Sequence, residues 1–450
     1  MPRSSKDRVE FHLEAESARS PRVIEEDEPF RIALAGDFGG RRQRVRHPIL
    51  IDRDNFEEVL ESLDVQIDLP GGRLHVTSLD HFHPDHLYAT HPAFHEMRET
   101  RARLNDPATS AQAARELAGE QHVRQPIPMP PTSGSLLDLI AGAGGTAAQP
   151  AQPTGDLQEF IDRAMRPYLE PRPDSRASEL IGQVDEIAAD LLRAMLHQAR
   201  FKTIEAAWRM LYRLVRRLET GTDLKLYLID ISKEELAENP EEFYQTLLRQ
   251  PDPWAVIAGN YAFPSSELGL LQVMGKIAAR LEVPFLAEAD ASLVGADPKW
   301  SAFRQTAEAK HVGLALPRIQ LRLPYGAETD PCEVPGFEEI SGKPDARHML
   351  YGNPGYFLAA LLGETFQSYG WQMRPGAVRD ISNLPVYTYE EDGEKKAFPC
   401  GEIELTQDTA EALMDEGFIP LAAIRDTDVV RVLRFQSAAE PVTALSGRWN

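Results

Sequence analysis

Metal-binding side chains gather in one short stretch, His81, His83, Asp85 and His86. The stretch follows a predicted strand. Three imidazoles and one carboxylate placed there could hold two zinc ions, and zinc lowers the pKa of a bound water toward neutrality. The pattern HxHxDH therefore raises the hypothesis of a metal-dependent hydrolase.

The same pattern resembles the binuclear metal signature of the metallo-β-lactamase superfamily, which needs further ligands at later strand ends, usually a His, a bridging Asp and a final His. A helical stretch carries His197, and Leu87-Tyr88 stands where a small residue pair normally lets a helix approach the metals. The later histidines are His91, His95, His122, His197, His311 and His348. We predict no metal site and keep the metallohydrolase as an alternative.

Other catalytic signatures are missing from the sequence or lack their context. Asp37-Phe38-Gly39 copies the magnesium-binding triplet of protein kinases, but the glycine-rich loop, strand lysine and catalytic loop that should precede it cannot fit in 36 residues. The sequence contains no GxxxxGK[ST], no GxSxG and no GxGxxG after a strand. We therefore expect no catalytic residues, no cofactor and no enzymatic activity.

Composition narrows the class of protein. The chain has 450 residues, 42% of them hydrophobic, which predicts two or three globular domains. Its formal charge of −22 argues against nucleic-acid or anionic-membrane partners. A charged start and the lack of a long apolar run predict neither a signal peptide nor a membrane span. With only Cys332 and Cys400, the sequence fits the cytoplasm.

The first segment predicts a small α/β unit after an acidic arm over residues 1–30. Apolar runs predict strands at 31–35 and 48–51, followed by a helix from about residue 55. Apolar and polar residues alternate on either side of Pro70-Gly-Gly72, which predicts a hairpin. Apolar residues at helical spacing predict a helix over about 91–104. We interpret residues 31–105 as one segment.

Residues 106–155 are rich in Ala, Gly, Pro, Gln and Ser, which predicts a linker with too little apolar content to pack. One short apolar helix is expected inside it, at 135–141. Its partner-binding side chains would be Leu136, Leu137, Leu139 and Ile140. Such a turn could fold when it docks on a partner.

The remaining residues, 156–450, alternate between helix and strand patterns. Helices are predicted at 180–195, 204–218 and 268–281, and strands at 224–228, from 254, and at 284–286. Beyond 311 the pattern is richer in strands, and a helix ends at Gly417. The succession predicts an α/β fold, with mixed sheets and flanking helices.

Several ordered motifs between about 180 and 440 resemble the large subunit, of TssC/VipB type, of the type VI secretion sheath. The stretch FKTIEAAWRML resembles the family's FxxLEAAWRGL, and LPRIQLRLPYG resembles LPRxLLRxPYG. The residues that carry these and the smaller matches are Phe201, Glu205, Trp208, Arg209, Pro317, Arg318, Arg322, Pro324, Tyr325, Gly326, Asn353 and Trp371.

The first segment resembles the small sheath subunit, of TssB/VipA type. The matches are Gly36-Asp37-Phe38, the stretch IDRDNF at 51–56, and Phe82-His83-Pro84-Asp85 before a helix. This family has a polar loop of the form DFxPD at the last position, which accounts for the histidine cluster without a metal.

These resemblances imply a phage-tail-sheath-like fold and a structural protomer of a contractile sheath in the bacterial cytoplasm. They also imply the partners: other sheath subunits, an inner tube protein of the Hcp type, a baseplate and a ClpV-type AAA+ ATPase that would bind the 135–141 turn. No nucleic acid and no membrane insertion are expected.

The chain departs from the family pattern at two places. The small-subunit-like part stops near residue 105, and the large-subunit-like part stops at Asn450. In the family, these ends supply strands that neighbouring protomers exchange. A second interpretation is therefore a sheath-like adaptor, cap or baseplate-associated protein that does not polymerise.

Overall fold

The computed structural model describes residues 28–40, 47–119, 177–295, 298–425 and 427–449. Contacts divide the chain into two compact units. Unit 1 comprises Met1–Val65, Thr203–Leu323 and Lys343–Asn450, and unit 2 comprises Gln66–Lys202 and Pro324–Gly342. Each unit thus combines part of the beginning of the chain with part of its second half.

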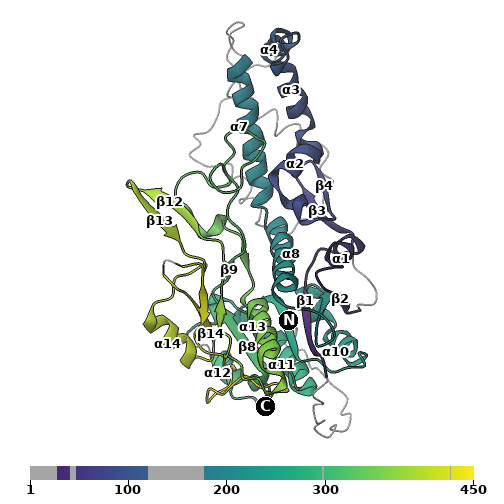
Figure 1. Ribbon diagram of the computed structural model, residues 1–450, viewed down its shortest axis with the longest axis vertical. Coiled ribbons are helices and arrows are strands. Elements are labelled where there is room, and N and C mark those ends of the chain that lie inside the picture. Colours follow the sequence, from purple (N-terminus) through teal and green to yellow (C-terminus); the bar gives the residue numbers. More distant parts are fainter. Residues whose placement is uncertain (1–27, 41–46, 120–176, 296–297, 426, 450) are drawn as a thin grey trace, which may run out of the picture. The chain divides into compact units, whose positions relative to one another are not determined.

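Unit 1 is built on a sheet that, within the described residues, has nine strands in the order β11-β15-β14-β8-β7-β6-β1-β5-β2 (Figure 1). The central strands β8, β7, β6, β1 and β5 are parallel. At one edge β2 runs antiparallel to β5, and near the other edge β15 runs antiparallel to β14. The mixed α/β fold predicted from the sequence is confirmed.

Strand β1, Phe30–Gly36, lies inside this sheet although it comes from the beginning of the chain. It pairs with β5 from Phe30↔Leu224 to Gly36↔Asp230, and on its other side with β6. All seven residues are buried, as expected of a parallel strand covered on both faces. The buried Arg31 guanidinium lies 4.5 Å from the Tyr227 ring centroid and 4.3 Å from that of Trp254.

Helices cover both faces of the sheet. One face packs on α9 to α12, whose buried side chains form a single apolar cluster with Ala33, Ala35 and Ile257 of the sheet. The other face carries α13, which contacts β1, β6, β7 and β8 (Figure 1). Gly355 permits this close approach, since a Cβ there would lie 2.8 Å from the Ala287 backbone.

The remaining elements of unit 1 follow the same chain order. Its helices are α1 Phe56–Ser62, most of α8 Ala199–Arg217, α9 Lys233–Glu238, α10 Pro240–Leu248, α11 Leu268–Leu281, α12 Pro298–Arg304, α13 Pro354–Tyr369 and α14 Gln407–Asp415. Its other strands are β2 Ile49–Ile51, β5 Leu224–Asp230, β6 Val256–Phe263, β7 Phe285–Ala289, β8 Val312–Leu316, β9 Ile319–Gln320, β10 Tyr351–Gly352, β11 Asp380–Ile381, β12 Tyr387–Glu391, β13 Glu394–Phe398, β14 Ile419–Ala423 and β15 Val430–Val432.

Unit 2 is mainly helical, with one hairpin. Helices α3 and α7 lie side by side, joined by the Arg101–Asp185 ion pair at 2.6 Å (Figure 1). Its elements are β3 Val65–Leu69, β4 Gly72–Val76, α2 Pro84–Thr90, α3 His95–Asn105, α4 Ser110–Gly119 and α7 Ala177–Leu196. Asp185 is buried on an otherwise apolar helix face, and its partner Arg101 compensates its charge.

Three elements differ from the sequence predictions. Residues 110–119, predicted as linker, form α4, whose Ala113 is buried and whose Glu116 pairs with Arg103. The single helix predicted over 91–104 is two elements, a 3-10 turn at Pro92–Phe94 and then α3. Helix α13 was not predicted, because it is buried on nearly all sides and lacks an amphipathic period.

No helix among the described residues combines the length and the apolar character needed to cross a membrane.

Candidate functional site

Trp208 on α8 is the centre of an aromatic cluster in unit 1. Its side chain is fully buried, and its indole Nε1 donates a hydrogen bond of 2.9 Å to the carbonyl of Phe38. The Phe38 ring lies 5.4 Å away and the Phe56 ring 5.7 Å, both edge-on. Phe38 follows β1 and Phe56 begins α1, so one tryptophan fixes two elements from the beginning of the chain.

Asp230, at the end of β5, contacts the turn at Phe38 that follows β1. Its carboxylate accepts a 2.9 Å hydrogen bond from the Phe38 backbone N–H. Gly40 packs against this carboxylate so closely that a Cβ would lie 2.2 Å from it. Packing therefore requires glycine at position 40, and the positive φ of 81° favours glycine at position 39. The Asp37-Phe38-Gly39 triplet is a structural turn.

Glu205 lies one helical turn before Trp208 and is completely buried. Its Oε1 accepts hydrogen bonds from Arg322 Nε and Arg209 Nε, each at 2.7 Å. Arg322 also reaches Oε2 at 3.3 Å, so the carboxylate and this guanidinium form a paired contact. The structure thus brings together charged residues of two sequence motifs, and a buried charge of this kind requires such partners.

In unit 2, the remaining motif residues make structural contacts. Phe201 packs edge-on against Phe82, with ring centroids 5.5 Å apart. The backbone N–H of Tyr325 donates to buried Glu339 at 2.9 Å, and Gly326 N–H donates to the Asp330 carbonyl at 3.0 Å. The carbonyl of Pro324 accepts a hydrogen bond from the Thr329 hydroxyl at 2.5 Å.

Arg318 and Asn353 lie near the carboxyl end of the parallel strands. Arg318, which follows Pro317, donates to Glu402 at 2.8 and 2.5 Å. Asn353 caps α13 by accepting from the Gly355 N–H, and its amide donates to the Tyr261 carbonyl at 3.2 Å. Sequence reasoning identified Arg318 and Asn353, but it did not identify Glu402.

Trp371 belongs to an aromatic cluster where the described chain begins and ends. Its indole donates to the Glu28 carbonyl at 2.8 Å, and its ring centroid lies 5.4 Å from that of Phe30. The centroid of the Trp449 ring lies 6.5 Å from that of Phe30, and Arg448 pairs with the Glu28 carboxylate. This cluster holds the amino end of β1 in the sheet.

The side chains of the HxHxDH motif make two separate sets of contacts. The rings of His81 and His86 stack with centroids 3.9 Å apart, and burial followed by the neighbouring His81 lowers the pKa of His86. His83 instead caps α2, since its Nδ1 accepts from the Asp85 N–H at 3.2 Å, while its Nε2 faces Asp330 at 3.7 Å. Asp85 itself accepts from the Glu333 N–H at 2.7 Å.

These contacts leave the four side chains of the HxHxDH motif without a common centre. Among the residues that the structure describes, no group of three or more His, Cys, Asp and Glu side chains is placed to hold a metal ion. The motif residues act here as caps and as contacts between loops.

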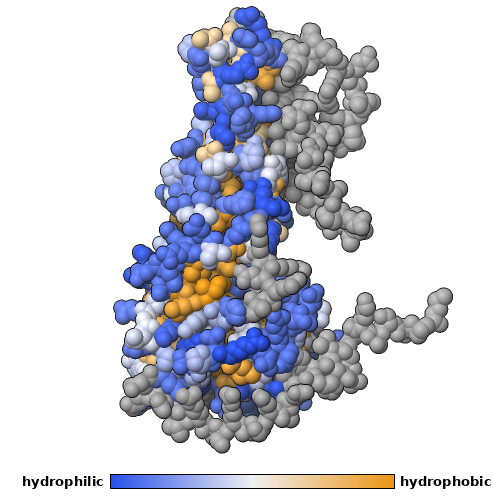
Figure 2. All heavy atoms as spheres, turned by 90° about the vertical axis from the view of Figure 1, so that its right-hand side faces the viewer, coloured by the Kyte–Doolittle hydropathy of each residue, from blue (hydrophilic) through white to orange (hydrophobic). Residues whose placement is uncertain are grey.

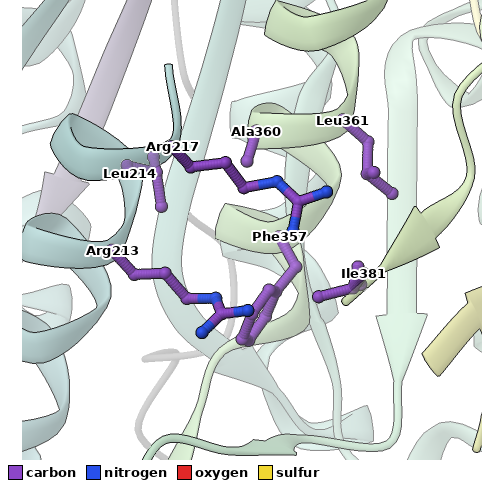
Figure 3. Close-up of a pocket in the computed structure, with 7 residues that line it drawn as sticks. All are labelled: Arg213, Leu214, Arg217, Phe357, Ala360, Leu361 and Ile381. Atoms are coloured by element: carbon purple, nitrogen blue, oxygen red, sulfur yellow. The ribbon is translucent and has the colours of Figure 1, made fainter. Parts of the chain in front are cut away.

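A depression between α8 and α13 carries two arginines over an apolar floor (Figure 3). Arg217 pairs with Glu364 and donates to the Asp380 carbonyl at 3.0 Å, while Arg213 donates to the Asn383 carbonyl at 3.2 Å. Burial lowers the pKa of both guanidinium groups, and for Arg217 the nearby Arg213 lowers it further. Because protein acceptors engage both arginines, this arrangement is a packing contact.

Unit 1 exposes apolar side chains near the edge strand β2. Leu50 of β2 is 44% exposed and Tyr212 of α8 is 41% exposed. The side of the molecule on which β2 lies in Figure 1 carries an apolar patch in Figure 2. The outer edge of β2 has no partner strand among the described residues.

Sequence reasoning did not identify Phe38, Phe56 and Glu288 as site residues. The two phenylalanines lie in the stretches that resemble the small subunit, and only the structure reveals their common partner Trp208. Glu288 is a lone acidic residue in the apolar strand Phe285–Ala289, an available signal, because buried carboxyl groups usually have partners. The predicted partner-binding residues Leu136, Leu137, Leu139 and Ile140 lie outside the described residues.

Comparison with known proteins gives two matches. The family model VipB, described as EvpB/VC_A0108, tail sheath N-terminal domain, matches residues 178–299 and 297–439, together more than half of the chain. The type VI secretion system sheath protein TssC1 of Pseudomonas aeruginosa is 28% identical over 340 residues, covering 64% of this chain and 68% of its own length.

Proposed function

The chain belongs to the VipB family of tail-sheath proteins, and from this premise we propose that residues 31–105 provide the small sheath subunit within the same polypeptide. As a member of this family, the chain is a structural protomer of a type VI secretion sheath. The proposal concerns the segment before residue 178, which the family model does not match.

The position of β1 is the observation that carries the proposal. Strands β5 and β6 both belong to the part that matches the family, yet they do not pair with each other, because β1 lies between them. Without Phe30–Gly36, the backbone groups that face this gap would lose their partners in the middle of a buried sheet. The family-matching part therefore needs a strand from elsewhere, and the first segment supplies it.

The aromatic contacts support the same proposal. Phe38 and Phe56 come from the first two of the three stretches that resemble the small subunit, and Trp208 comes from the motif that resembles the large subunit. In unit 2, Phe82 of the third stretch packs on Phe201 of that same motif. Each stretch thus contacts the large-subunit-like part.

The proposed role is mechanical. Stacked protomers would surround an inner tube of the Hcp type, attach to a baseplate, and contract by passing between two packing arrangements, a bistable interface. The segment 135–141 would present Leu136, Leu137, Leu139 and Ile140 to a ClpV-type ATPase after contraction. The protomer would act in the bacterial cytoplasm and carry out no catalysis itself.

Electron microscopy of the purified full-length protein at several concentrations and salt levels tests this role. Tubes or stacked rings are expected of a protomer that polymerises. A strict monomer or small oligomer under all conditions would contradict it and favour the adaptor, cap or baseplate-associated protein. Binding of zinc, iron or manganese after metal-supplemented expression would instead favour the metallohydrolase alternative at His81, His83, Asp85 and His86.

A further inference from the structure

Glu288 is a carboxyl group that lies inside unit 1, near the carboxyl end of β7, with weak partners. Its side chain is 15% exposed. The Asn353 amide lies 3.4 Å from one of its oxygens, and Arg318 Nε lies 3.8 Å from the other. Both distances exceed those of a good hydrogen bond, so the negative charge of ionised Glu288 would be poorly compensated.

The nearest cation, Arg318, is committed to another carboxylate. It donates to both oxygens of Glu402, at 2.8 and 2.5 Å, and its guanidinium lies 5.9 Å from the Tyr351 ring centroid. Arg318 therefore stands between two carboxyl groups and can pair fully with one of them at a time.

Other charged groups near Glu288 do not supply the positive charge that would compensate an ionised Glu288. Asp290, on the same chain segment, adds negative charge, and Lys233 is engaged with the Ala262 carbonyl at 2.9 Å and with Glu267 at 2.6 Å. Burial, opposed by Arg318 and reinforced by Glu402 and Asp290, raises the pKa of Glu288 to about 7. Its charge consequently changes near neutral pH.

We propose that Glu288, Arg318 and Glu402 form a proton-operated latch, in which neutral Glu288 leaves Arg318 on Glu402 and ionised Glu288 draws Arg318 away. The inference concerns this chain alone and does not depend on the proposed sheath role.

Backbone hydrogen bonds next to the Arg318–Glu402 ion pair would weaken when that pair opens. The N–H of Glu402 donates to the Arg318 carbonyl at 2.9 Å, and the N–H of Gln320 donates to the Cys400 carbonyl at 2.7 Å. Ile319 also bridges to Gly401. Residues 400–402 follow directly on the β12–β13 hairpin, so release of Arg318 from Glu402 would loosen the base of that hairpin.

Hydrogen exchange of the full-length protein at several pH values between 6 and 8 tests the latch, with each rate divided by the intrinsic rate at that pH. Peptides covering 318–321 and 399–403 should exchange at least about threefold faster at pH 8 than at pH 6, because the weaker contact lowers local opening free energy. Equal corrected rates across this range would overturn the proposal. Glu288→Gln should abolish the difference, whereas Glu267→Gln, a neighbouring carboxylate that does not touch Arg318, should retain it.

A second variant keeps the test decisive if Glu288→Gln fails to fold. Glu402→Gln removes the carboxylate that holds Arg318 when Glu288 is neutral, so the peptides covering 318–321 and 399–403 should already exchange at pH 6 about as fast as the parent does at pH 8. Parent-like pH dependence in Glu402→Gln or in Glu288→Gln would overturn the latch.

Discussion

Truncation of Trp208 tests whether the beginning of the chain is anchored where the structure places it. Trp208→Ala opens a cavity at a site with no solvent exposure, which typically costs about 3–5 kcal/mol. The Phe38 carbonyl also loses its indole donor, a further cost of about 1 kcal/mol. We therefore expect a loss of about 5 kcal/mol in the free energy of unfolding of unit 1.

Urea denaturation followed by far-ultraviolet circular dichroism measures this loss. Tyr212→Ala is the matched control, because Tyr212 lies one turn further along α8 and packs on the same Phe56 ring at 5.3 Å, but is 41% exposed. The control should cost about 1 kcal/mol, since its exposed ring buries less surface. Trp208→Phe should fall between the two, because it keeps a ring and loses the N–H. If Trp208→Ala costs no more than Tyr212→Ala, the aromatic anchor is misplaced.

Three further predictions concern assembly, buried charge and pH. A protease site placed within residues 120–176 should, after cleavage, yield two fragments that co-elute on size-exclusion chromatography, because β1 lies between β5 and β6; separate elution without denaturant would contradict the interlocked sheet. Glu205→Ala should destabilise by about 3–5 kcal/mol in thermal or urea unfolding, because Arg322 and Arg209 would lose their buried partner; a loss below about 1 kcal/mol would count against that ion-pair cluster. The free energy of unfolding should fall by about 2.5 kcal/mol between pH 5 and pH 8 in the parent relative to Glu288→Gln, because the folded chain keeps a proton, with pKa about 7, that the unfolded chain releases near 4.5. Parallel pH profiles of the two proteins would refute this assignment.

Local patterns predicted most strands and amphipathic helices of this chain. The run before Gly36 and the alternation around Pro70-Gly-Gly72 both form strands in the structure, because each pattern is decided by residues close in sequence. Helix α13 escaped prediction because burial on nearly all sides erases the helical period. Helix α4 was read as linker because alanine-rich sequence resembles low-complexity sequence, although alanine also has the highest helix propensity.

Motif residues were predictable one by one, but their contacts were not. Glu205 and Arg322 stand in different motifs 117 positions apart, and the sequence contains no signal that pairs them. Likewise, a metal pattern such as HxHxDH specifies side-chain types but not their directions. The structure turns His81 toward His86 and His83 toward Asp330.

The central position of β1 has a consequence for how this protomer forms. The partners Leu224 and Val256 lie roughly 200 residues after β1 in the chain, so the sheet closes only through contacts of very large sequence separation. If β1 and its partner strands belonged to two separate chains, closing the sheet would cost the translational entropy that the two chains lose when they associate. Because β1 and its partner strands belong to one chain, β1 acts at a high effective concentration, about the mM range for a short linker. The presence of β1 and its partner strands in one chain therefore favours insertion of β1, and the aromatic cluster around Trp208 and the ion pair between Glu28 and Arg448 hold it after insertion.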